Sequence, residues 1–492
     1  MRKSILLLIY MMFICIITRA QSNITWNPAM NVATSSSGNM HPRMTLDGKG
    51  NPLVIWGRMS DGAVYFSRWT GTMFTTPVKL NPAWLRVATA TWMGPDIASK
   101  GDTVYVVVKR SPEASDTNYI YIMRSFNGGV SFSAPVRVDN IADSISRFPT
   151  VSVDALGNPI VAFMKFNASF MDSRWVVAKS NDYGISFSKD VKASGYSGAG
   201  AEVCDCCPGA IVTSGTVSAV VYRDNLSNIR DMWTGISVNN SISFNSGFAV
   251  DKTNWFLQSC PASGPDAVIV GDSLYTVFMS GASTKNRIYY SRSSINTGVV
   301  NSVSTASGNI ASLNQQNFPR IATDGLAAAI VWNQSVSGAA QLPLVFTNDI
   351  TKGFPITYDT VDLNDVTNSD IAMANGKIYV LWEDDNSGTV KFRNGTYKPL
   401  NTGIPAIIKS ESVEFICYPN PASDVLNIIS PVEGPYKINL INSLGENVYE
   451  MESESCQSIP LSNILPGMYL VRLVPINGLD DKQVFTQKII RQ

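Results

Sequence analysis

The chain has 492 residues, of which 45% are hydrophobic and 15% charged, so it is long enough for about two or three domains with packed cores. Its 38 Lys and Arg residues balance 38 Asp and Glu residues, which excludes a global electrostatic attraction to nucleic acid or to an anionic membrane. The single histidine, His41, excludes a metal site built from several histidines, and a histidine-centred triad would have to use His41 itself.

Residues 1–20 have the pattern of a cleavable signal peptide. Arg2 and Lys3 precede an apolar run from Ile5 to Ile17, and Thr18-Arg19-Ala20 offers a small-residue cleavage site. The run is shorter than the roughly 20 apolar residues of a membrane span, and no later stretch is long enough. We therefore expect export through the periplasm, with no transmembrane segment in the mature chain.

A repeated pattern with a period of 53 to 59 residues runs through residues 40–400. Each copy begins with a short segment that usually contains proline, followed by an apolar strand, a turn and further short strands. We call these the opening segments. They are His41-Pro42-Arg43, Gly94-Pro95-Asp96, Phe148-Pro149-Thr150, Cys207-Pro208-Gly209, Gly264-Pro265-Asp266, Phe318-Pro319-Arg320 and, without the proline, Ser369-Asp370-Ile371.

Four short strands per copy, with Gly, Asn and Asp turns and no helical periodicity, predict an all-β propeller. Seven copies favour seven blades, and six blades result if the last copy is partial. We expect Ile24–Val32 to close the ring by pairing with the last copy, which removes exposed sheet edges. Aromatic residues at the ends of second strands are expected to pack between blades rather than to stack on sugars; they are Trp56, Phe163, Tyr222, Phe278, Trp332 and Trp382.

Turns between the third and fourth strands contain a sharper motif. Ser180–Phe187 fits the Asp-box pattern Ser-x-Asp-x-Gly-x-x-aromatic at every fixed position, and Ser125–Phe132 and Ser237–Phe244 fit it with substitutions. In such a turn the Asp side chain caps the backbone, Gly permits a positive φ and the aromatic ring packs between sheets, so the motif is expected to serve folding. With these motifs, residues 40–400 resemble the sialidase-like propellers with Asp-box (BNR) repeats.

The last part of the chain has the composition of a small, immunoglobulin-like β-sandwich. Its ordered motifs are Tyr418-Pro419-Asn420-Pro421, Asn442-Ser443-Leu444-Gly445 and Leu465-Pro466-Gly467. This order resembles the type A C-terminal sorting domain of the type IX secretion system, which implies passage through that machinery to the outer cell surface or the medium. An ordinary accessory module is the alternative. The expected domains are a signal peptide at 1–20, a propeller at 21–400, a linker at 401–414 and a sorting domain at 415–492.

Two repeat positions should meet on one face of a propeller, around its axis: the start of the innermost strand and the end of the second strand. The predicted ligand-binding residues at these positions are Arg43, Arg58, Asp96, Lys109, Arg110, Lys165, Arg223, Asp224, Asp266, Arg320, Glu383 and Asp384. Arginine forks suit carboxylate or sulfate groups, and Asp and Glu accept from hydroxyl groups. This favours a glycan or another extracellular polymer as partner, and inter-blade ion pairs around the channel are the alternative.

The resemblance to sialidases implies an arginine trio, a Tyr–Glu nucleophile pair and an Asp acid/base. The candidates here are Arg43, Arg223 and Arg320 for the trio, with Tyr222, Glu383 and Asp96 as catalytic partners. Phe318-Pro319-Arg320-Ile321 departs from the Phe/Tyr-Arg-Ile-Pro segment of sialidases, and no motif assigns the nucleophile. The sequence therefore favours a non-catalytic binding or adhesion module over a glycoside hydrolase of the exo-sialidase type.

Removal of residues 1–20 leaves six cysteines, and an even number in an exported protein favours disulfides. Cys417 and Cys456 are expected to pair. Cys207 and Cys260 begin neighbouring copies and are expected to join two blades, which leaves Cys204 and Cys206 to pair locally. The alternative is a soft-metal or redox site at Cys204–Cys207 and Cys260. The sequence assigns no cofactor.

Overall fold

The computed structural model describes residues 23–32, 38–113, 119–140, 144–308, 313–363, 366–400, 416–429, 435–442, 445–453, 457–476 and 485–491. The predicted signal peptide, the predicted linker and Cys456 lie outside these ranges. The chain divides into two compact units at residue 400. Within the described ranges, no helix has the length and apolar character needed to cross a membrane.

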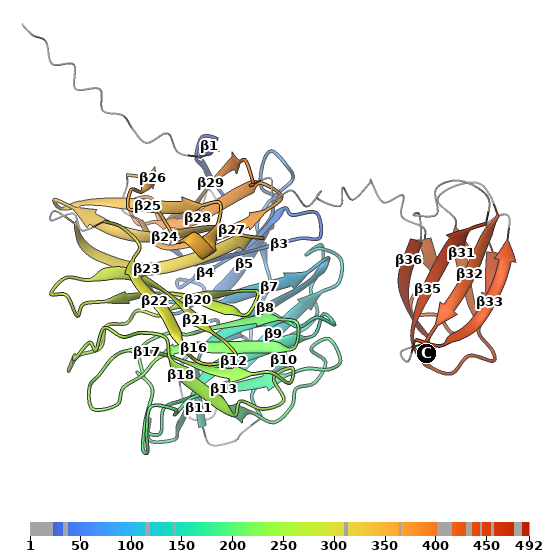
Figure 1. Cartoon of the computed structure of the whole chain (residues 1–492), viewed down its shortest axis with the longest axis horizontal. Coiled ribbons are helices and arrows are strands. Elements are labelled where there is room, and N and C mark those ends of the chain that lie inside the picture. The colour runs from blue at the N-terminus through green and yellow to red at the C-terminus, as the bar shows by residue number, and fades with distance from the viewer. Residues whose placement is uncertain are drawn as a thin grey trace, which may run out of the picture. The chain divides into compact units, whose positions relative to one another are not determined.

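In the first unit, the described strands form seven antiparallel sheets, which we call blades 1 to 7 (Figure 1). Blade 1 contains β3 (Asn39–Leu46), β4 (Pro52–Arg58), β5 (Ala63–Arg68) and β6 (Val78–Lys79). Blade 2 contains β7 (Asp96–Lys100), β8 (Thr103–Lys109), β9 (Ile120–Ser125) and β10 (Val136–Arg137). Blade 3 contains β11 (Ser144–Val153), β12 (Pro159–Asn167), β13 (Arg174–Lys179) and β14 (Val191–Lys192).

Blades 4 to 7 follow the same order along the chain. Blade 4 contains β15 (Ala210–Ser214), β16 (Val217–Arg223), β17 (Met232–Ser237) and β18 (Ser246–Ala249). Blade 5 contains β19 (Asp266–Val270), β20 (Ser273–Ser280), β21 (Arg287–Ser294) and β22 (Val300–Thr305). Blade 6 contains β23 (Leu313–Asp324), β24 (Ala327–Val336), β25 (Ala339–Thr347), the 3₁₀ turn η1 (Ile350–Lys352) and β26 (Asp359–Asp362). Blade 7 contains β27 (Val366–Ala374), β28 (Lys377–Asp384) and β29 (Thr389–Tyr397), joined by β1 (Ile24–Trp26) and β2 (Met30–Asn31).

The blades close into a ring, as a propeller requires. The innermost strand of each blade lies beside that of the next, and β27 of blade 7 lies beside β3 of blade 1. Strand β1 pairs with β29, with Ile24 opposite Tyr397, so the predicted closure of the last blade by the start of the chain is confirmed. The number of sheets equals the number of repeat copies in the sequence.

Apolar side chains of neighbouring blades form the core. Leu53 and Ile55 of blade 1 pack in one cluster with Val104 and Val106 of blade 2, and similar clusters join the other blades. Second strands read as continuous apolar runs because both of their faces are covered. The six aromatic residues predicted to pack between blades are all nearly inaccessible, with at most 1% of each exposed.

The turn between β13 and β14 shows what the Ser180–Phe187 motif does. Ser180 Oγ donates to Asp182 Oδ1 at 2.7 Å, and the amide of Gly184 donates to Ser180 Oγ at 2.7 Å. Asp182 also accepts from the amide of Ser186 at 2.9 Å. Gly184 has φ of 82°, a value that glycine adopts without steric cost. The motif therefore holds a turn on the side of blade 3.

The second unit is a two-sheet sandwich. One sheet contains β30 (Ile416–Tyr418), β31 (Val425–Ile429) and β34 (Gln457–Pro460). The other contains β33 (Asn447–Ser453), β32 (Tyr436–Ile441), β35 (Gly467–Pro475) and β36 (Phe485–Arg491). Leu426 and Ile459 of the first sheet share a core with Leu440, Val471 and Ile489 of the second.

Candidate functional site

Four opening segments carry a β-bulge. The pairing of the first two strands shifts register at the opening segment in blades 1, 3, 6 and 7. In each bulge one residue has a positive φ, between 44° and 52°. An extra residue bends a strand and changes the direction of its side chains. The residues with positive φ are His41, Phe148, Phe318 and Asn368.

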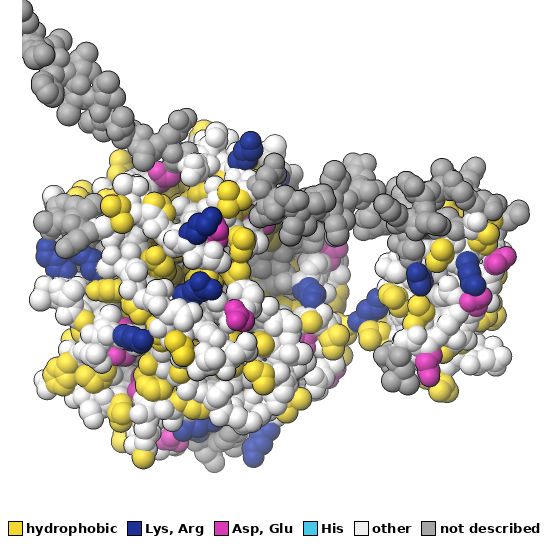
Figure 2. Space-filling model, in the orientation of Figure 1, with side chains coloured by type: hydrophobic (Ala, Val, Ile, Leu, Met, Phe, Trp, Pro, Cys, Tyr) yellow, Lys and Arg dark blue, Asp and Glu magenta, His cyan; other side chains and the backbone are white. Residues whose placement is uncertain are grey.

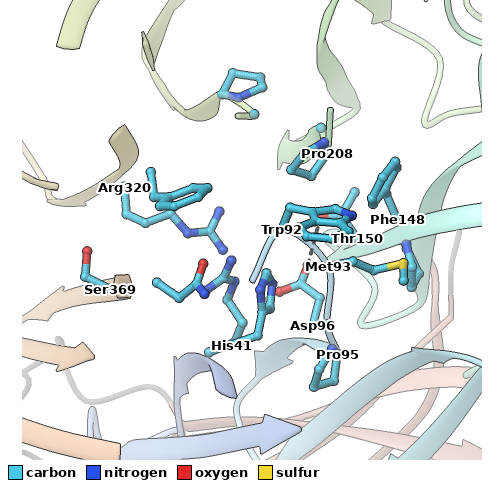
Figure 3. A pocket seen from close by; sticks show the side chains of 18 of the residues that line it. His41, Trp92, Met93, Pro95, Asp96, Phe148, Thr150, Pro208, Arg320 and Ser369 are labelled. Carbon is cyan, nitrogen blue, oxygen red and sulfur yellow. Dashed lines mark hydrogen bonds between the residues drawn. The ribbon is translucent and has the colours of Figure 1, made fainter. Parts of the chain in front are cut away.

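The opening segments of all seven blades surround one cavity of about 630 Å³, counting the part open to solvent, which we call the axial cavity. Figure 3 shows Arg320, Asp96 and His41 around its middle, with Trp92 and Phe148 on one side. Much of the wall is apolar, because prolines from five opening segments line it together with Trp92, Met93, Phe148 and Phe318. The polar wall residues are His41, Arg43, Asp96, Thr150, Arg320, Asn368 and Ser369.

Two guanidinium groups, from blades 1 and 6, face the axial cavity. Arg320 lies 3.5 Å from Asp266 and 3.4 Å from Asp370, and its Nε makes no hydrogen bond to any described residue. Burial alone would lower the pKa of Arg320, but Asp266 and Asp370 outweigh it and raise the pKa. Burial, together with the charge of Arg320, lowers the pKa of Arg43 to about 10, so both side chains are cationic at neutral pH.

Three carboxylates around the axis join neighbouring blades. Asp96 Oδ2 accepts from the amide of Val151 at 3.0 Å and from Thr150 Oγ1 at 2.8 Å. At the same repeat position, Asp266 accepts from the amide of Ile321 at 3.0 Å, and Asp370 from the amide of Met44 at 2.7 Å. Each bond runs from one blade to the first strand of the next. These three carboxylates therefore hold neighbouring blades together by hydrogen bonds.

The sequence assigned no binding role to His41, which served only to exclude a site with several histidines, yet His41 is part of the cavity wall. Its ring packs directly on Gly94: a Cβ atom at position 94 would lie 2.5 Å from the imidazole ring. A residue larger than glycine therefore does not fit at position 94 without a shift of His41. Its amide donates to Glu383 Oε2 at 3.0 Å, and Asn368 Nδ2 donates to the same oxygen at 3.0 Å. Burial and the nearby Arg43 hold the pKa of His41 well below its usual value. Its position directly before Pro42, in the first opening segment, was the sequence feature that could have indicated its place in the wall.

The predicted arginine trio is not assembled. Arg223 is fully buried away from the axial cavity, where it donates to the carbonyl groups of Ser263, Arg230 and Met279 at 2.7 to 3.2 Å. Tyr222 is fully buried in the core between blades, and its hydroxyl group makes no hydrogen bond to the described residues. Both residues lie at the end of β16, and neither lines the axial cavity.

Three of the remaining predicted cations are held in ion pairs outside the axial cavity. Arg58 pairs with Asp61 at 3.0 Å, Lys109 with Glu113 at 2.9 Å and Lys165 with Asp190 at 2.7 Å. Asp384 pairs with Lys391. Neither Arg110 nor Asp224 lines the axial cavity. Of the twelve predicted ligand-binding residues, Arg43, Asp96 and Arg320 line it, and Asp266 supports Arg320.

The cysteines differ from the predicted pairing. A disulfide joins Cys206 to Cys260, with Cα atoms 6.3 Å apart, so blades 4 and 5 are linked as expected but through a different residue. Cys207 is buried while Cys260 is exposed, and the half-exposed Cys206 faces it instead. Cys204 and Cys207 are thiols with sulfur atoms 3.1 Å apart, and the contact with Cys207 lowers the pKa of Cys204 to about 7. The pairing of Cys417 with Cys456 stays a prediction.

Charged side chains are spread over the described part of the face that Figure 2 shows. Figure 2 shows Lys and Arg side chains scattered singly or in small groups, with acidic side chains between them, over the face in view. This distribution agrees with the balanced composition.

Solved structures similar to this chain include three carbohydrate-active enzymes. They are the GH93 alpha-L-arabinofuranosidase of Fusarium graminearum (11% identity, TM-score 0.46, covering 76% of this chain and 98% of that one), a PL25 ulvan lyase (12%, 0.46, 75% and 94%) and the NanB sialidase of Streptococcus pneumoniae (13%, 0.40, 75% and 70%). Likeness at this level does not indicate a shared ligand or activity. No curated protein matches the chain.

The second unit is identified by its sequence. The family model of the secretion system C-terminal sorting domain matches residues 416–492. These residues include the two-sheet sandwich and the motifs that resemble the type A domain. Residues 416–492 are thus a C-terminal sorting domain of the type IX secretion system, and the chain is exported to the outer surface or secreted.

Proposed function

We propose that the propeller is a non-catalytic binding module that holds an acidic sugar unit of an extracellular glycan in the axial cavity. The observation that carries this proposal is the position of Arg43 and Arg320, whose guanidinium groups face the cavity from two different blades. Each guanidinium group carries five N–H donors, and the ion pairs of Arg320 with Asp266 and Asp370 are long, at 3.5 and 3.4 Å. A planar guanidinium group binds a carboxylate or a sulfate group with two parallel hydrogen bonds.

The walls of the axial cavity suit a sugar ring. Trp92, Phe148 and Phe318 present apolar surface, and Thr150 and Ser369 carry hydroxyl groups. Small-molecule sites combine mostly apolar walls with a few polar groups, as the wall of the axial cavity does.

We propose binding without catalysis because the candidate catalytic groups are engaged in the fold or buried. Asp96 and Glu383 each accept two or more hydrogen bonds that hold the fold, and Tyr222 is fully buried. An acid/base must reach the proton that it transfers, and a nucleophile must reach the sugar. Hydrolysis of a glycan in this cavity would therefore need groups other than the predicted ones.

The test is a binding measurement with the purified full chain by isothermal titration. The ligands are an oligogalacturonate, a sulfated oligosaccharide and a neutral oligosaccharide of the same length. We expect binding of one or both acidic ligands, and Arg320→Ala and Arg43→Ala should each weaken it roughly 10- to 100-fold, because a hydrogen bond to a charged group is lost.

Arg58→Ala is the matched control, since Arg58 is paired with Asp61 outside the axial cavity. Equal binding of the neutral ligand, or full affinity in Arg320→Ala and Arg43→Ala, would contradict the proposal. A fluorogenic sialoside incubated with the same protein tests the rival hypothesis. Turnover that is lost in Arg320→Ala would establish the hydrolase instead.

A further inference from the structure

A second cavity lies on blade 4 and shares no lining residue with the axial cavity. It has a volume of about 810 Å³, counting the part open to solvent. Its wall comes mainly from the loop between β16 and β17, the start of β17, and the end of β18 with the segment that follows it, and Ser197 joins it from the segment between β14 and β15. We call it the acidic cavity, because Asp224, Asp231 and Asp251 line it together with the apolar side chains of Leu226, Ile229 and Trp233.

The three carboxylates are almost completely buried, with 2%, 5% and 2% of Asp224, Asp231 and Asp251 exposed. Asp231 and Asp251 have backbone partners: Asp231 accepts from the amide of Trp255 at 2.9 Å, and Asp251 from that of Thr253 at 2.7 Å. Asp224 differs, since its Oδ1 makes no hydrogen bond of good geometry to the described residues, although the hydroxyl group of Ser197 and the amides of Leu226 and Asn225 lower the pKa of Asp224. Buried polar groups nearly always have a partner, so Oδ1 is available as an acceptor for a ligand in the cavity.

The cations near the acidic cavity are engaged elsewhere. Arg223 and Arg230 are buried beside it, but each donates to carbonyl groups. Lys252 also belongs to the wall, and its Nζ donates to the carbonyl of Val300 at 3.3 Å. In the described part of the chain, no ion pair involves any of the three carboxylates.

The pKa values of two of the carboxylates are consistent with the lack of a neighbouring cation in the acidic cavity. Burial raises the pKa of Asp224 to about 6. The pKa of Asp251 is also raised to about 6, by burial and then by the charge of Asp231. At neutral pH the acidic cavity therefore holds ionised carboxylates that a bound cation would stabilise.

The shape and spacing of the acidic cavity favour an organic cation over a metal ion. Among the described residues, the group whose ligand atoms lie within 4.8 Å of one another is at Cys204 and Cys260, not at these carboxylates. An ammonium group on a carbon skeleton can donate to separate carboxylates while its apolar body covers Leu226 and Ile229. Trp233 adds an aromatic ring that can attract a cation.

We propose that the acidic cavity binds an organic ammonium group, with Asp224, Asp231 and Asp251 as its acceptors and Trp233 beside it. Amino sugars of a glycan and lysine side chains of a peptide both present this chemistry. The site is independent of the axial cavity and of the ligand proposed for it, since the two cavities have separate walls.

The test is isothermal titration of the purified full chain at pH 7.5 with two probes, a glucosamine trisaccharide and trilysine. Their N-acetylated forms serve as uncharged controls of similar size. We expect at least one ammonium probe to bind and its acetylated form to bind at least 10-fold more weakly. Binding of the sugar probe alone assigns the amino-sugar source, and binding of trilysine alone assigns the peptide source.

Variants then locate the site. Asp224→Asn and Asp251→Asn should each weaken the binding at least 10-fold, while Asp102→Asn, at an exposed loop of blade 2, should leave it unchanged. The proposal is overturned if neither ammonium probe binds or if acetylation makes no difference. It is equally overturned if both cavity variants, shown to be folded by their urea midpoints, keep full affinity.

Discussion

Removal of the Cys206–Cys260 disulfide should destabilise the propeller by about 4 kcal/mol. The bond closes a loop of 54 residues between the starts of blades 4 and 5. In the chain-entropy relation, a loop of this length removes about 14 cal/mol/K from the unfolded chain, or about 4 kcal/mol at 25 °C. The double variant Cys206→Ala, Cys260→Ala returns this entropy to the unfolded state and should lower the free energy of unfolding accordingly.

The assay is urea unfolding followed by tryptophan fluorescence. All ten tryptophans precede residue 400, so the signal reports the propeller and not the sorting domain. With a slope of about 3 kcal/mol per M, the urea midpoint should fall by about 1.3 M. Cys204→Ala is the control, because it removes a buried thiol and leaves the disulfide in place.

Reductant should shift the wild-type midpoint toward that of the double variant and leave the double variant unchanged. A double variant with the wild-type midpoint would refute the reasoning. That result would mean that the unfolded chain is already restricted in the region of blades 4 and 5 without the disulfide, or that the disulfide does not contribute to the free energy of unfolding.

Three further predictions concern single residues. Tyr222→Phe should raise the free energy of unfolding by about 1 kcal/mol and leave ligand binding intact, because it removes a buried hydroxyl group that makes no hydrogen bond to the described residues; a loss of stability in urea unfolding or of affinity in titration would contradict this. Asp182→Ala should cost about 1 to 2 kcal/mol in urea unfolding, since it removes the acceptor of Ser180 and Ser186, and an unchanged midpoint would argue against the capping role. Because the pKa of Asp251 is raised to about 6, the folded state binds the proton of this carboxyl group more tightly than the unfolded state does. The contribution of Asp251 to the free energy of unfolding therefore falls as the pH rises from about 4 to 6. Asp251→Asn should therefore exceed the wild type by up to about 3 kcal/mol at pH 7 and by little at pH 4, and an equal difference at both pH values would exclude this cause.

Much of the fold could be predicted because its signals are local and repeated. Each opening segment is followed by an apolar second strand, and seven such copies specify the sheets before any long-range contact is known. Trp56, Trp332 and Trp382 recur at one position of the repeat, which indicated burial between blades. The start of the chain, with strand character and no blade, indicated its pairing with the last copy.

The candidate site was harder to predict because it depends on partners far apart in sequence. Asp370 accepts from the amide of Met44, 326 residues away, and nothing near Asp370 in the sequence indicates this bond. The bulges also decide which side chains reach the axis, and their positive φ values fall on residues as different as His41 and Phe148. Arg223 has the right residue type at a plausible repeat position, yet carbonyl groups of blades 4 and 5 bind it in the interior.

The pairing of the cysteines was also difficult to predict from the sequence. Cys206 and Cys207 are adjacent, so their spacing to Cys260 is almost the same and the sequence cannot separate them. The choice is made by which side chain is turned into the core, and Cys207 is the buried one. The predicted link between neighbouring blades was correct at the level of the repeat and wrong by one residue.

The pairing of β1 with β29 also bears on the order of events during export. The two strands come from opposite ends of the propeller sequence, so the ring cannot be completed until both ends are on the same side of a membrane. Before that point β29 has an open edge, because β1 is its outer neighbour in the sheet. Both closing strands precede the sorting domain, and a protease that cuts after residue 400 would release a propeller with its closure intact.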